Sequence, residues 1–110
     1  MSDDNQQRWE STLDRVSQAI AFNSNSALAY NNRGFVYYNL QKWDLALADY
    51  NRAIELNPNL ALAYYNRGNL YKDRQKGDLA LADYNRAIEL NPNSALAYIH
   101  RGFLYTNQQQ

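Results

Sequence analysis

Amide and aromatic side chains are the residues of this sequence that could best contact a ligand. Many of them recur at intervals of three or four, which places side chains on one face of a helix. Each Asn can donate and accept hydrogen bonds, which suits the backbone of an extended peptide, while rings and aliphatic groups give apolar contact. The candidate set is Asn31, Asn32, Phe35, Tyr38, Asn39, Tyr65, Asn66, Asn69, Lys72, Ile99 and Phe103. These side chains could therefore contact a ligand from one face of a helical scaffold.

The residues that most enzymes and metal sites require are scarce. The sequence has no Cys and a single His, His100, so it offers no thiol nucleophile and no Cys-based zinc site. Its four Gly residues are isolated, so no Gly-rich phosphate-binding loop is present. We expect no enzymatic activity, no cofactor and no bound metal, and a surface or groove position for His100.

Charge and hydropathy favour a protein or peptide partner. Eleven Lys and Arg residues balance eleven Asp and Glu residues, whereas nucleic acid and anionic membranes select basic surfaces. No apolar run approaches the ~18 residues of a membrane span, and the N-terminus is too polar for a signal peptide. The expectation is a cytoplasmic protein with neither a nucleic-acid nor a membrane partner.

The candidate set lies in a repeat with a period of 34 residues. Residues 27–60 and 61–94 align without a gap and differ at only eight positions, and a third copy begins at Ala95. Such self-similarity predicts a stack of units that bury their apolar faces against each other. The apolar spacing predicts two helices in each full copy, separated by short turns and ended by Asn-Pro-Asn. The predicted helices cover residues 2–22, 27–40, 43–56, 60–74, 77–90 and 95–107.

The repeat resembles the tetratricopeptide repeat family. The matching residues are Tyr30, Gly34, Tyr37, Ala46, Tyr50, Ala53 and Pro58, with Tyr64, Gly68, Tyr71, Ala80, Tyr84, Ala87 and Pro92 in the second copy and Tyr98, Gly102 and Tyr105 in the third. Arg stands before each Gly where the family has Leu, and Tyr50 and Tyr84 replace Phe. The resemblance implies an all-α fold, a right-handed α-solenoid of stacked antiparallel helix-turn-helix repeats, with six helices here. It also implies a concave groove, lined by the candidate set, that receives a peptide.

Four segments follow from this pattern. Residues 1–26 are predicted to be a degenerate half repeat, one helix that caps the N-terminal end, because a shift of 34 places Trp9 on Trp43 and Leu13 on Leu47. Residues 27–60 and 61–94 are the two full repeats. Residues 95–110 are predicted to be the first helix of an incomplete third repeat, followed by a tail.

Packing partners can also be predicted from the sequence. Gly34 and Gly68 recur inside a helix, which costs about 1 kcal/mol relative to Ala, so we expect close contacts with Ala46 and Ala80. Asp49 with Arg52, and Asp83 with Arg86, are three residues apart and predict solvated ion pairs. The Arg before each repeated Gly (Arg33, Arg67 and Arg101) is expected to pair with a neighbouring Asp or Glu.

The predicted function is a protein-interaction scaffold that binds a short extended peptide. Some tetratricopeptide proteins hold a C-terminal carboxylate with Lys, Asn and Arg side chains, but the corresponding residues here are Asn31, Phe35, Asn66, Leu96 and His100, of which only Asn66 matches. We therefore predict that the groove is not of the carboxylate-clamp type. One alternative is a structural module that forms a homo-oligomer through its uncapped C-terminal helix, where Tyr98, Leu104 and Tyr105 form an apolar strip. A remote alternative is RNA binding.

Overall fold

A computed structural model describes residues 2–108, and this part of the chain contains six α-helices and no strand. The helices are α1 (Asp3–Phe22), α2 (Ala27–Asn39), α3 (Trp43–Leu56), α4 (Ala61–Asp73), α5 (Gly77–Leu90) and α6 (Ala95–Gln108). Each predicted boundary lies within one residue of the observed one, and the predicted all-α class is confirmed. The last two residues of the predicted tail, Gln109 and Gln110, lie outside the described residues.

Serine side chains fix the start of three helices, and at α6 the Ser94 Oγ accepts a hydrogen bond from the Ala97 N–H over 3.3 Å. Ser2 Oγ accepts a hydrogen bond from the Asn5 N–H over 3.3 Å, and Ser26 Oγ accepts one from the Ala29 N–H over 3.1 Å. These bonds satisfy N–H groups that have no partner within the first helical turn. Asp3 and Asp4 add negative charge beside the positive end of the α1 dipole.

Glutamine in a left-handed conformation makes the turn inside each full repeat. Gln41 and Gln75 have φ angles of 61° and 62°. The Lys42 N–H then bonds to the Tyr37 carbonyl over 2.9 Å, and the Lys76 N–H bonds to the Tyr71 carbonyl over 2.8 Å. In each case the donor lies two residues after the helix cap, and the acceptor is the third residue from the end of the helix. This bond defines a Schellman motif.

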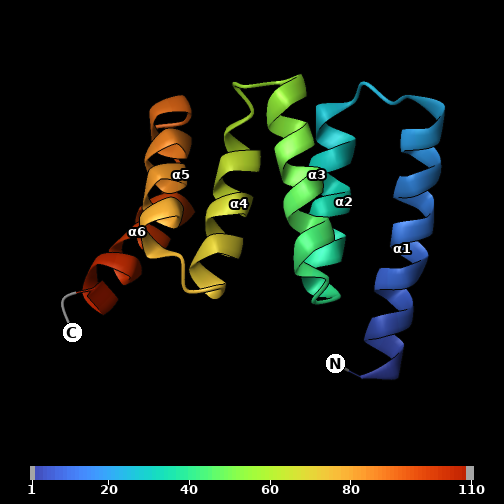
Figure 1. Cartoon of the computed structure of the whole chain (residues 1–110), viewed down its shortest axis with the longest axis horizontal. Coiled ribbons are helices and arrows are strands. Elements are labelled where there is room, and N and C mark those ends of the chain that lie inside the picture. Colours follow the sequence, from blue (N-terminus) through green and yellow to red (C-terminus); the bar gives the residue numbers. More distant parts are fainter. Residues whose placement is uncertain (1, 109–110) are drawn as a thin grey trace. The chain divides into compact units, whose positions relative to one another are not determined.

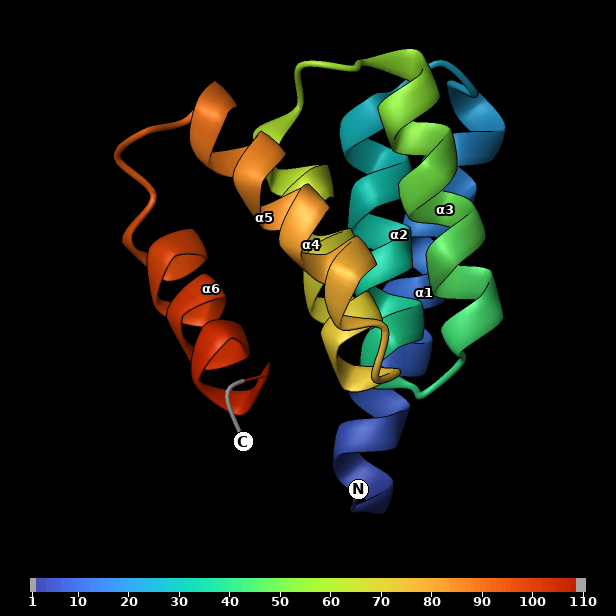
Figure 2. The same ribbon diagram turned by 60° about the vertical axis from the view of Figure 1, so that its left-hand side comes forward.

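The chain forms two compact units, divided after Pro58. In the first unit α2 and α3 pack as a pair and α1 packs on α2 (Figure 1). In the second unit α4 and α5 make the same pairing, and α6 packs mainly on α5 with a smaller contact to α4 (Figure 2). Both units therefore contain one complete helical hairpin and one additional helix. The interpretation of residues 1–26 as a degenerate half repeat stays a prediction.

A glycine lies under a tyrosine ring in both hairpins. A Cβ atom on Gly34 would lie 2.7 Å from ring carbons of Tyr50 and 3.2 Å from the Ala46 carbonyl oxygen. On Gly68 it would lie 2.8 Å from the Tyr84 ring and 3.4 Å from the Ala80 carbonyl oxygen. The predicted contacts of Gly34 with Ala46 and of Gly68 with Ala80 are confirmed, but neither alanine is the nearest neighbour of its glycine. The tyrosine one turn beyond each alanine lays its ring over the glycine and comes nearer than the alanine does.

Arginine and aspartate join the two helices of each hairpin. Arg33 donates to Asp49 from Nε and Nη2 over 2.7 and 2.8 Å, and Arg67 donates to Asp83 in the same way over 2.8 Å. The hydrogen bond to Asp49 raises the pKa of Arg33, although burial acts in the opposite direction. The predicted pairing of these arginines with acidic neighbours is confirmed for Arg33 and Arg67.

The ion pairs predicted within α3 and α5 were wrong. Asp49 and Asp83 instead pair with the arginines of α2 and α4 described above. Arg52 therefore pairs with Glu55, and Arg86 pairs with Glu89, each over 3.0 Å. A bidentate pair between two packed helices displaces a solvated pair along one helix, because desolvated charge-assisted bonds are stronger.

Candidate functional site

Six side chains from three helices meet in the second unit, and we call them the α4–α6 cluster. They are Tyr65, Asn69 and Lys72 of α4, Tyr84 of α5, and His100 and Phe103 of α6. The His100 ring lies 5.6 Å from the Tyr65 ring, 6.2 Å from that of Tyr84 and 6.5 Å from that of Phe103, between centroids. Four of the six belong to the predicted site set, and the structure brings them together.

Two hydrogen bonds fix the polar part of this cluster. Tyr84 donates from its hydroxyl to Asn69 Oδ1 over 2.6 Å, and Lys72 Nζ lies 2.7 Å from His100 Nδ1. Because an ammonium group can only donate, Nδ1 accepts and the ring proton lies on Nε2. Burial, and secondarily the charge of Lys72, lower the pKa of His100, while Asp73 acts in the opposite direction. The imidazole is therefore held neutral beside a charged amine.

Donor groups remain on this cluster after its internal bonds are made. The Asn69 amide keeps its NH2 group, and the Lys72 ammonium has three donors, of which His100 accepts one. Phe103, whose ring lies 6.5 Å from that of His100, is 60% exposed, and Ile99, one turn before it on α6, is 51% exposed. The arrangement offers hydrogen-bond donors beside exposed apolar side chains.

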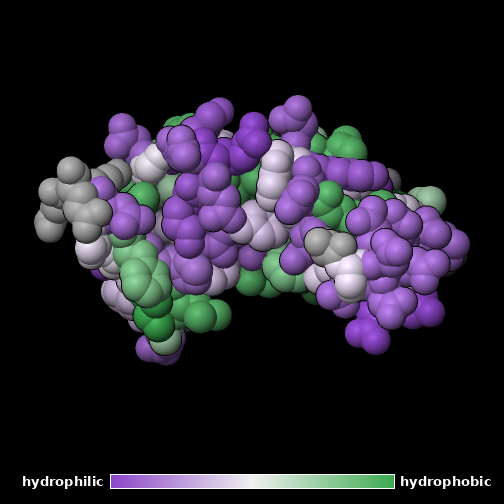
Figure 3. All heavy atoms as spheres, turned by 90° about the horizontal axis from the view of Figure 1, so that it is seen from below, coloured by the Kyte–Doolittle hydropathy of each residue, from purple (hydrophilic) through white to green (hydrophobic). Residues whose placement is uncertain are grey.

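A small hollow adjoins the cluster at Tyr65. Its volume is about 130 Å³ and its lining is mostly apolar, formed by Ala61, Leu62, Tyr65, Ala87, Asn91, Ser94 and Leu96. A cavity of about 150 Å³ holds one benzene ring, so this hollow has room for one apolar side chain of similar or smaller size. Hydrophobic residues also gather at the end of the space-filling view where α6 lies (Figure 3).

His100, Tyr84, Leu62 and Leu96 were not predicted as site residues. Tyr84 occupies a position that is identical in both copies. Such identity is expected of a residue that packs inside every repeat, so it gave no reason to place Tyr84 in a binding site. Leu62 and Leu96 lie in the first turns of their helices, and their exposed fractions of 46% and 58% are the signal that marks them. Nothing in the spacing of the sequence distinguishes them from packing residues.

Predicted residues of the first unit form separate aromatic contacts. The Phe35 ring meets the Trp9 ring edge to face at 5.9 Å, and the Tyr38 ring meets that of Trp43 at 5.5 Å. The Asn39 side chain donates to the Phe35 carbonyl over 2.8 Å and so bonds within its own helix. The contact with Trp9 leaves Phe35 44% exposed, and we therefore retain its ring as an apolar contact surface.

The remaining predicted amides differ in accessibility. Asn32 is exposed, but Asn31 and Asn66 are only 1% and 7% exposed. Both buried amides make interactions inside the protein. They are therefore poor candidates for direct contact with a peptide, in contrast to Asn69.

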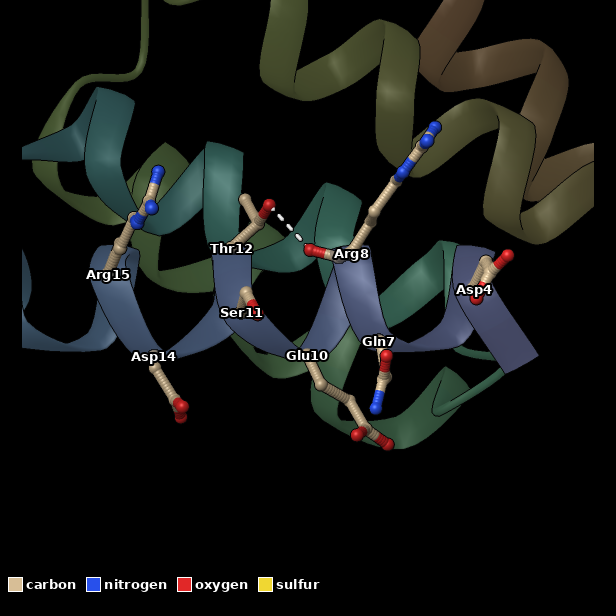
Figure 4. Close-up of a pocket in the computed structure, with 8 residues that line it drawn as sticks. All are labelled: Asp4, Gln7, Arg8, Glu10, Ser11, Thr12, Asp14 and Arg15. Atoms are coloured by element: carbon tan, nitrogen blue, oxygen red, sulfur yellow. Dashed lines mark hydrogen bonds between the residues drawn. The ribbon is translucent and has the colours of Figure 1, made fainter. Parts of the chain in front are cut away.

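A more open hollow lies on the surface of α1. It measures about 960 Å³ and is lined only by polar residues of that helix. Figure 4 shows these side chains spreading from one helix, with the Thr12 hydroxyl donating to the Arg8 carbonyl over 2.8 Å. A surface with a single wall cannot enclose a small molecule. Across residues 2–108 no group of three or more His, Cys, Asp or Glu is placed to hold a metal, and no helix is long and apolar enough to cross a membrane.

Solved structures share this arrangement of helices. The first TPR of Spaghetti (RPAP3), bound to the HSP90 peptide SRMEEVD, is 26% identical, with a TM-score of 0.89 over 96% of this chain and 84% of that one. The first TPR domain of human RPAP3 is 27% identical, with a TM-score of 0.87 over 93% and 80%. The TPR domain of Arabidopsis OM64 is 24% identical, with a TM-score of 0.88 over 92% and 84%. No curated protein matches the sequence.

Sequence models of one family cover most of the chain. The tetratricopeptide repeat model matches residues 27–60 and 61–94, and a second tetratricopeptide repeat model matches residues 83–110. Together with the helical hairpins and their Gly–Tyr contacts, these matches establish that the chain belongs to the tetratricopeptide repeat family, whose members are protein–protein interaction modules.

Proposed function

We propose that this chain is an interaction scaffold that binds a short extended peptide segment through the variable face of the first helix of each repeat, which is the face where the copies differ, as at Asn31/Tyr65 and Phe35/Asn69. The observation that carries the proposal is the α4–α6 cluster, where hydrogen-bond donors of Asn69 and Lys72 lie beside the exposed Phe103 ring and a side-chain-sized hollow. We further infer that the chain has no catalytic role, because Nδ1 of its single His is engaged by Lys72 and the sequence contains no Cys that could act as a thiol nucleophile.

In the proposed mode, the hollow at Tyr65 takes one apolar side chain of the peptide. The Asn69 NH2 group and the Lys72 ammonium donate to peptide carbonyl oxygens, and Phe103 and Ile99 pack against the next side chain. A contact of this size supports affinities of about 1 μM, or −8 kcal/mol.

We infer that the surface is not a carboxylate clamp. The RPAP3 relative is bound to an acidic HSP90 peptide. Here the clamp positions in α2 hold Asn31 and Phe35, those in α6 hold Leu96 and His100, and the one match, Asn66, is 7% exposed. Without a cluster of cations, a terminal carboxylate would lack the bidentate partners that hold it.

The test is selection of ligands from a random heptapeptide library on the immobilised chain, followed by calorimetry of the selected peptides. We expect Phe103→Ala and Tyr65→Ala to weaken binding about tenfold, the equivalent of 1.4 kcal/mol. Leu79→Ala is the matched control, since Leu79 is 49% exposed on α5 outside the cluster. Equal loss in the control, or no enriched peptide, would refute the proposal. Tight and salt-sensitive binding of SRMEEVD would refute the specificity inference alone.

Self-association through α6 is the second candidate function. Tyr98 and Tyr105 are each 44% exposed on that helix, although Leu104 of the predicted strip is 5% exposed and packs against α5. Light scattering across concentration tests it, and a monomer at high concentration would exclude it. A cytoplasmic location, and the absence of RNA, other nucleic-acid and membrane partners, stay predictions. Retardation of single-stranded RNA by the protein at low salt would contradict the prediction that RNA is not a partner.

A further inference from the structure

The α4–α6 cluster contains a positive charge that pairs with no carboxylate in the described part of the chain. Across residues 2–108 the half-buried Lys72 ammonium has one hydrogen-bond partner, Nδ1 of His100 at 2.7 Å. Four arginines of α2 to α5 are instead paired with carboxylates. Asp73 follows Lys72 in the chain, but it points about 100° further around the helix and forms no ion pair with Lys72. The charge of Lys72 is therefore available to an anionic group of a ligand.

Packing of the repeat does not explain this amine. Asn69 and Lys72 correspond to Phe35 and Tyr38 of the first repeat, each 34 residues earlier in the sequence. The hairpin of α2 and α3 forms the same inter-helix contacts with rings at these two places. An amide and an amine are thus not needed to pack α4 on α5, and their chemistry belongs to the variable face.

The variable face of α4 places this charge at a fixed distance from the apolar hollow. Leu62, Tyr65, Asn69 and Lys72 are spaced three, four and three residues apart, so they form one stripe along the helix. Leu62 and Tyr65 line the hollow of about 130 Å³. Lys72 follows Tyr65 by seven residues, and a rise of 1.5 Å per residue separates them by about 10 Å along the axis. An apolar hollow and a cation therefore lie on one stripe, about 10 Å apart.

This separation selects a spacing in the peptide. A polyproline II segment has three residues per turn and rises about 3.1 Å per residue, so side chains three residues apart lie on one side and about 9 Å apart. In a β-strand, side chains two or four residues apart share a side, at about 7 or 13 Å. The three-residue spacing of polyproline II matches the distance along α4 best.

We propose that the bound peptide carries an aliphatic side chain and, three residues away, an aspartate or glutamate, with its backbone in the polyproline II conformation. The aliphatic side chain enters the hollow at Tyr65. Of the two Lys72 N–H groups that His100 leaves, one donates to the side-chain carboxylate and the other stays with a peptide carbonyl, as does Asn69. A charge-assisted bond of this kind is roughly twice as strong as a neutral one. The inference rests on the proposed function and names the class of peptide that the site takes.

The test is calorimetric titration of the full chain with acetylated and amidated peptides whose cores are Leu-Pro-Pro-Glu and Glu-Pro-Pro-Leu. The blocked ends remove terminal charges, and the prolines favour polyproline II. We expect one of the two orders to bind, about tenfold more tightly than its Gln counterpart. One Pro fewer or one Pro more between the two side chains should weaken binding about tenfold, because the carboxylate then leaves Lys72.

Side-chain variants show whether Lys72 carries this preference. Lys72→Met should bind the Glu and Gln peptides equally. Lys76→Met is the matched control, since it removes the same charge from an exposed lysine at the start of α5 and should keep the preference. Lys72→Glu should instead prefer a peptide with Lys in place of Glu, about tenfold over the Glu peptide.

The outcomes separate this inference from the proposed function. Equal binding of the Glu and Gln peptides to the parent chain, with binding still lost in Tyr65→Ala, would overturn the acidic specificity and leave the peptide site standing. An equal loss of preference in Lys72→Met and Lys76→Met would also overturn it, because general surface charge would then be the cause. No binding of any of these peptides at millimolar concentration would overturn it as well, and would overturn the proposed function only if the random library also enriched no peptide.

Discussion

The hydroxyl group of Tyr84 on α5 donates a 2.6 Å hydrogen bond to Asn69 Oδ1 on α4. The bond joins a tyrosine that packs over Gly68 to a side chain on the variable face of α4. Tyr50 packs over Gly34 in the same manner, but the residue that corresponds to Asn69 there is Phe35, whose ring has no acceptor. A packing residue and a residue of the variable face are thus coupled in the second unit.

Tyr84→Phe should lower the free energy of unfolding by about 1 kcal/mol, the usual net value of one hydrogen bond. Tyr50→Phe is the matched control and should cost less, because no Asn69 equivalent is left unpaired. Urea unfolding curves measure both. Equal losses for the two variants would show that the Asn69 bond contributes nothing particular.

Alanine at the three repeated glycines should give effects of opposite sign. At Gly34 and Gly68 the new methyl group would overlap a tyrosine ring that is 1% or 0% exposed and cannot move aside, so we expect a loss of roughly 1–3 kcal/mol. At Gly102 the methyl group meets nothing, and Ala should gain up to about 1 kcal/mol from helix propensity. Thermal unfolding of the three variants measures this. A stabilised Gly34→Ala protein would contradict the packing described here.

Local signals made the helices predictable from the sequence, whereas the contacts between helices were less so. Ser26 caps the start of α2 and Asn57 caps the end of α3, both through contacts between residues close in sequence. The predicted ends of these helices therefore fall within one residue of the observed ends. The partner of Asp49 lies 16 residues away on another helix, which no spacing rule within one helix can find. The burial of Asn31, which is 1% exposed, could not be predicted for the same reason. It depends on neighbouring helices, which a helical wheel of α2 alone does not include.

Glycine at the turn positions should stabilise the hairpins. Gln41 and Gln75 have φ angles of 61° and 62°, a region that costs a residue with a Cβ roughly 1 kcal/mol. Gly removes this cost but gains freedom in the unfolded chain, so the expected net gain is about 0.5 kcal/mol for each variant. Gln6→Gly within α1 is the control and should destabilise. A lower melting temperature for Gln75→Gly would argue against the left-handed turn.

Removal of a buried carboxylate should cost more than removal of an exposed one. Asp83→Asn leaves the Arg67 guanidinium, which is 21% exposed, without its anionic partner, and we expect a loss of roughly 2 kcal/mol. Glu89→Gln breaks the Arg86 pair, whose side chains are 42% and 65% exposed, and should leave stability nearly unchanged because solvent screens the pair. Denaturant midpoints at constant pH distinguish the two. Similar midpoints would mean that the inter-helix pair is as solvated as the surface pair.

Protonation of His100 should make the protein less stable as the pH falls. Burial and Lys72 lower the pKa of His100 in the folded state, so the unfolded chain, with a histidine pKa near ~6.5, binds the proton more readily. Stability is then fully present above the unfolded pKa and declines as the pH falls below it, toward the lower folded value. Since His100 is the only histidine, the slope between neutral pH and the start of carboxylate titration reports on it. His100→Asn should flatten that slope, and Lys72→Met should reduce it, because the opposing charge is removed. Melting temperatures measured across this pH interval would refute the account if the parent and His100→Asn proteins showed the same slope.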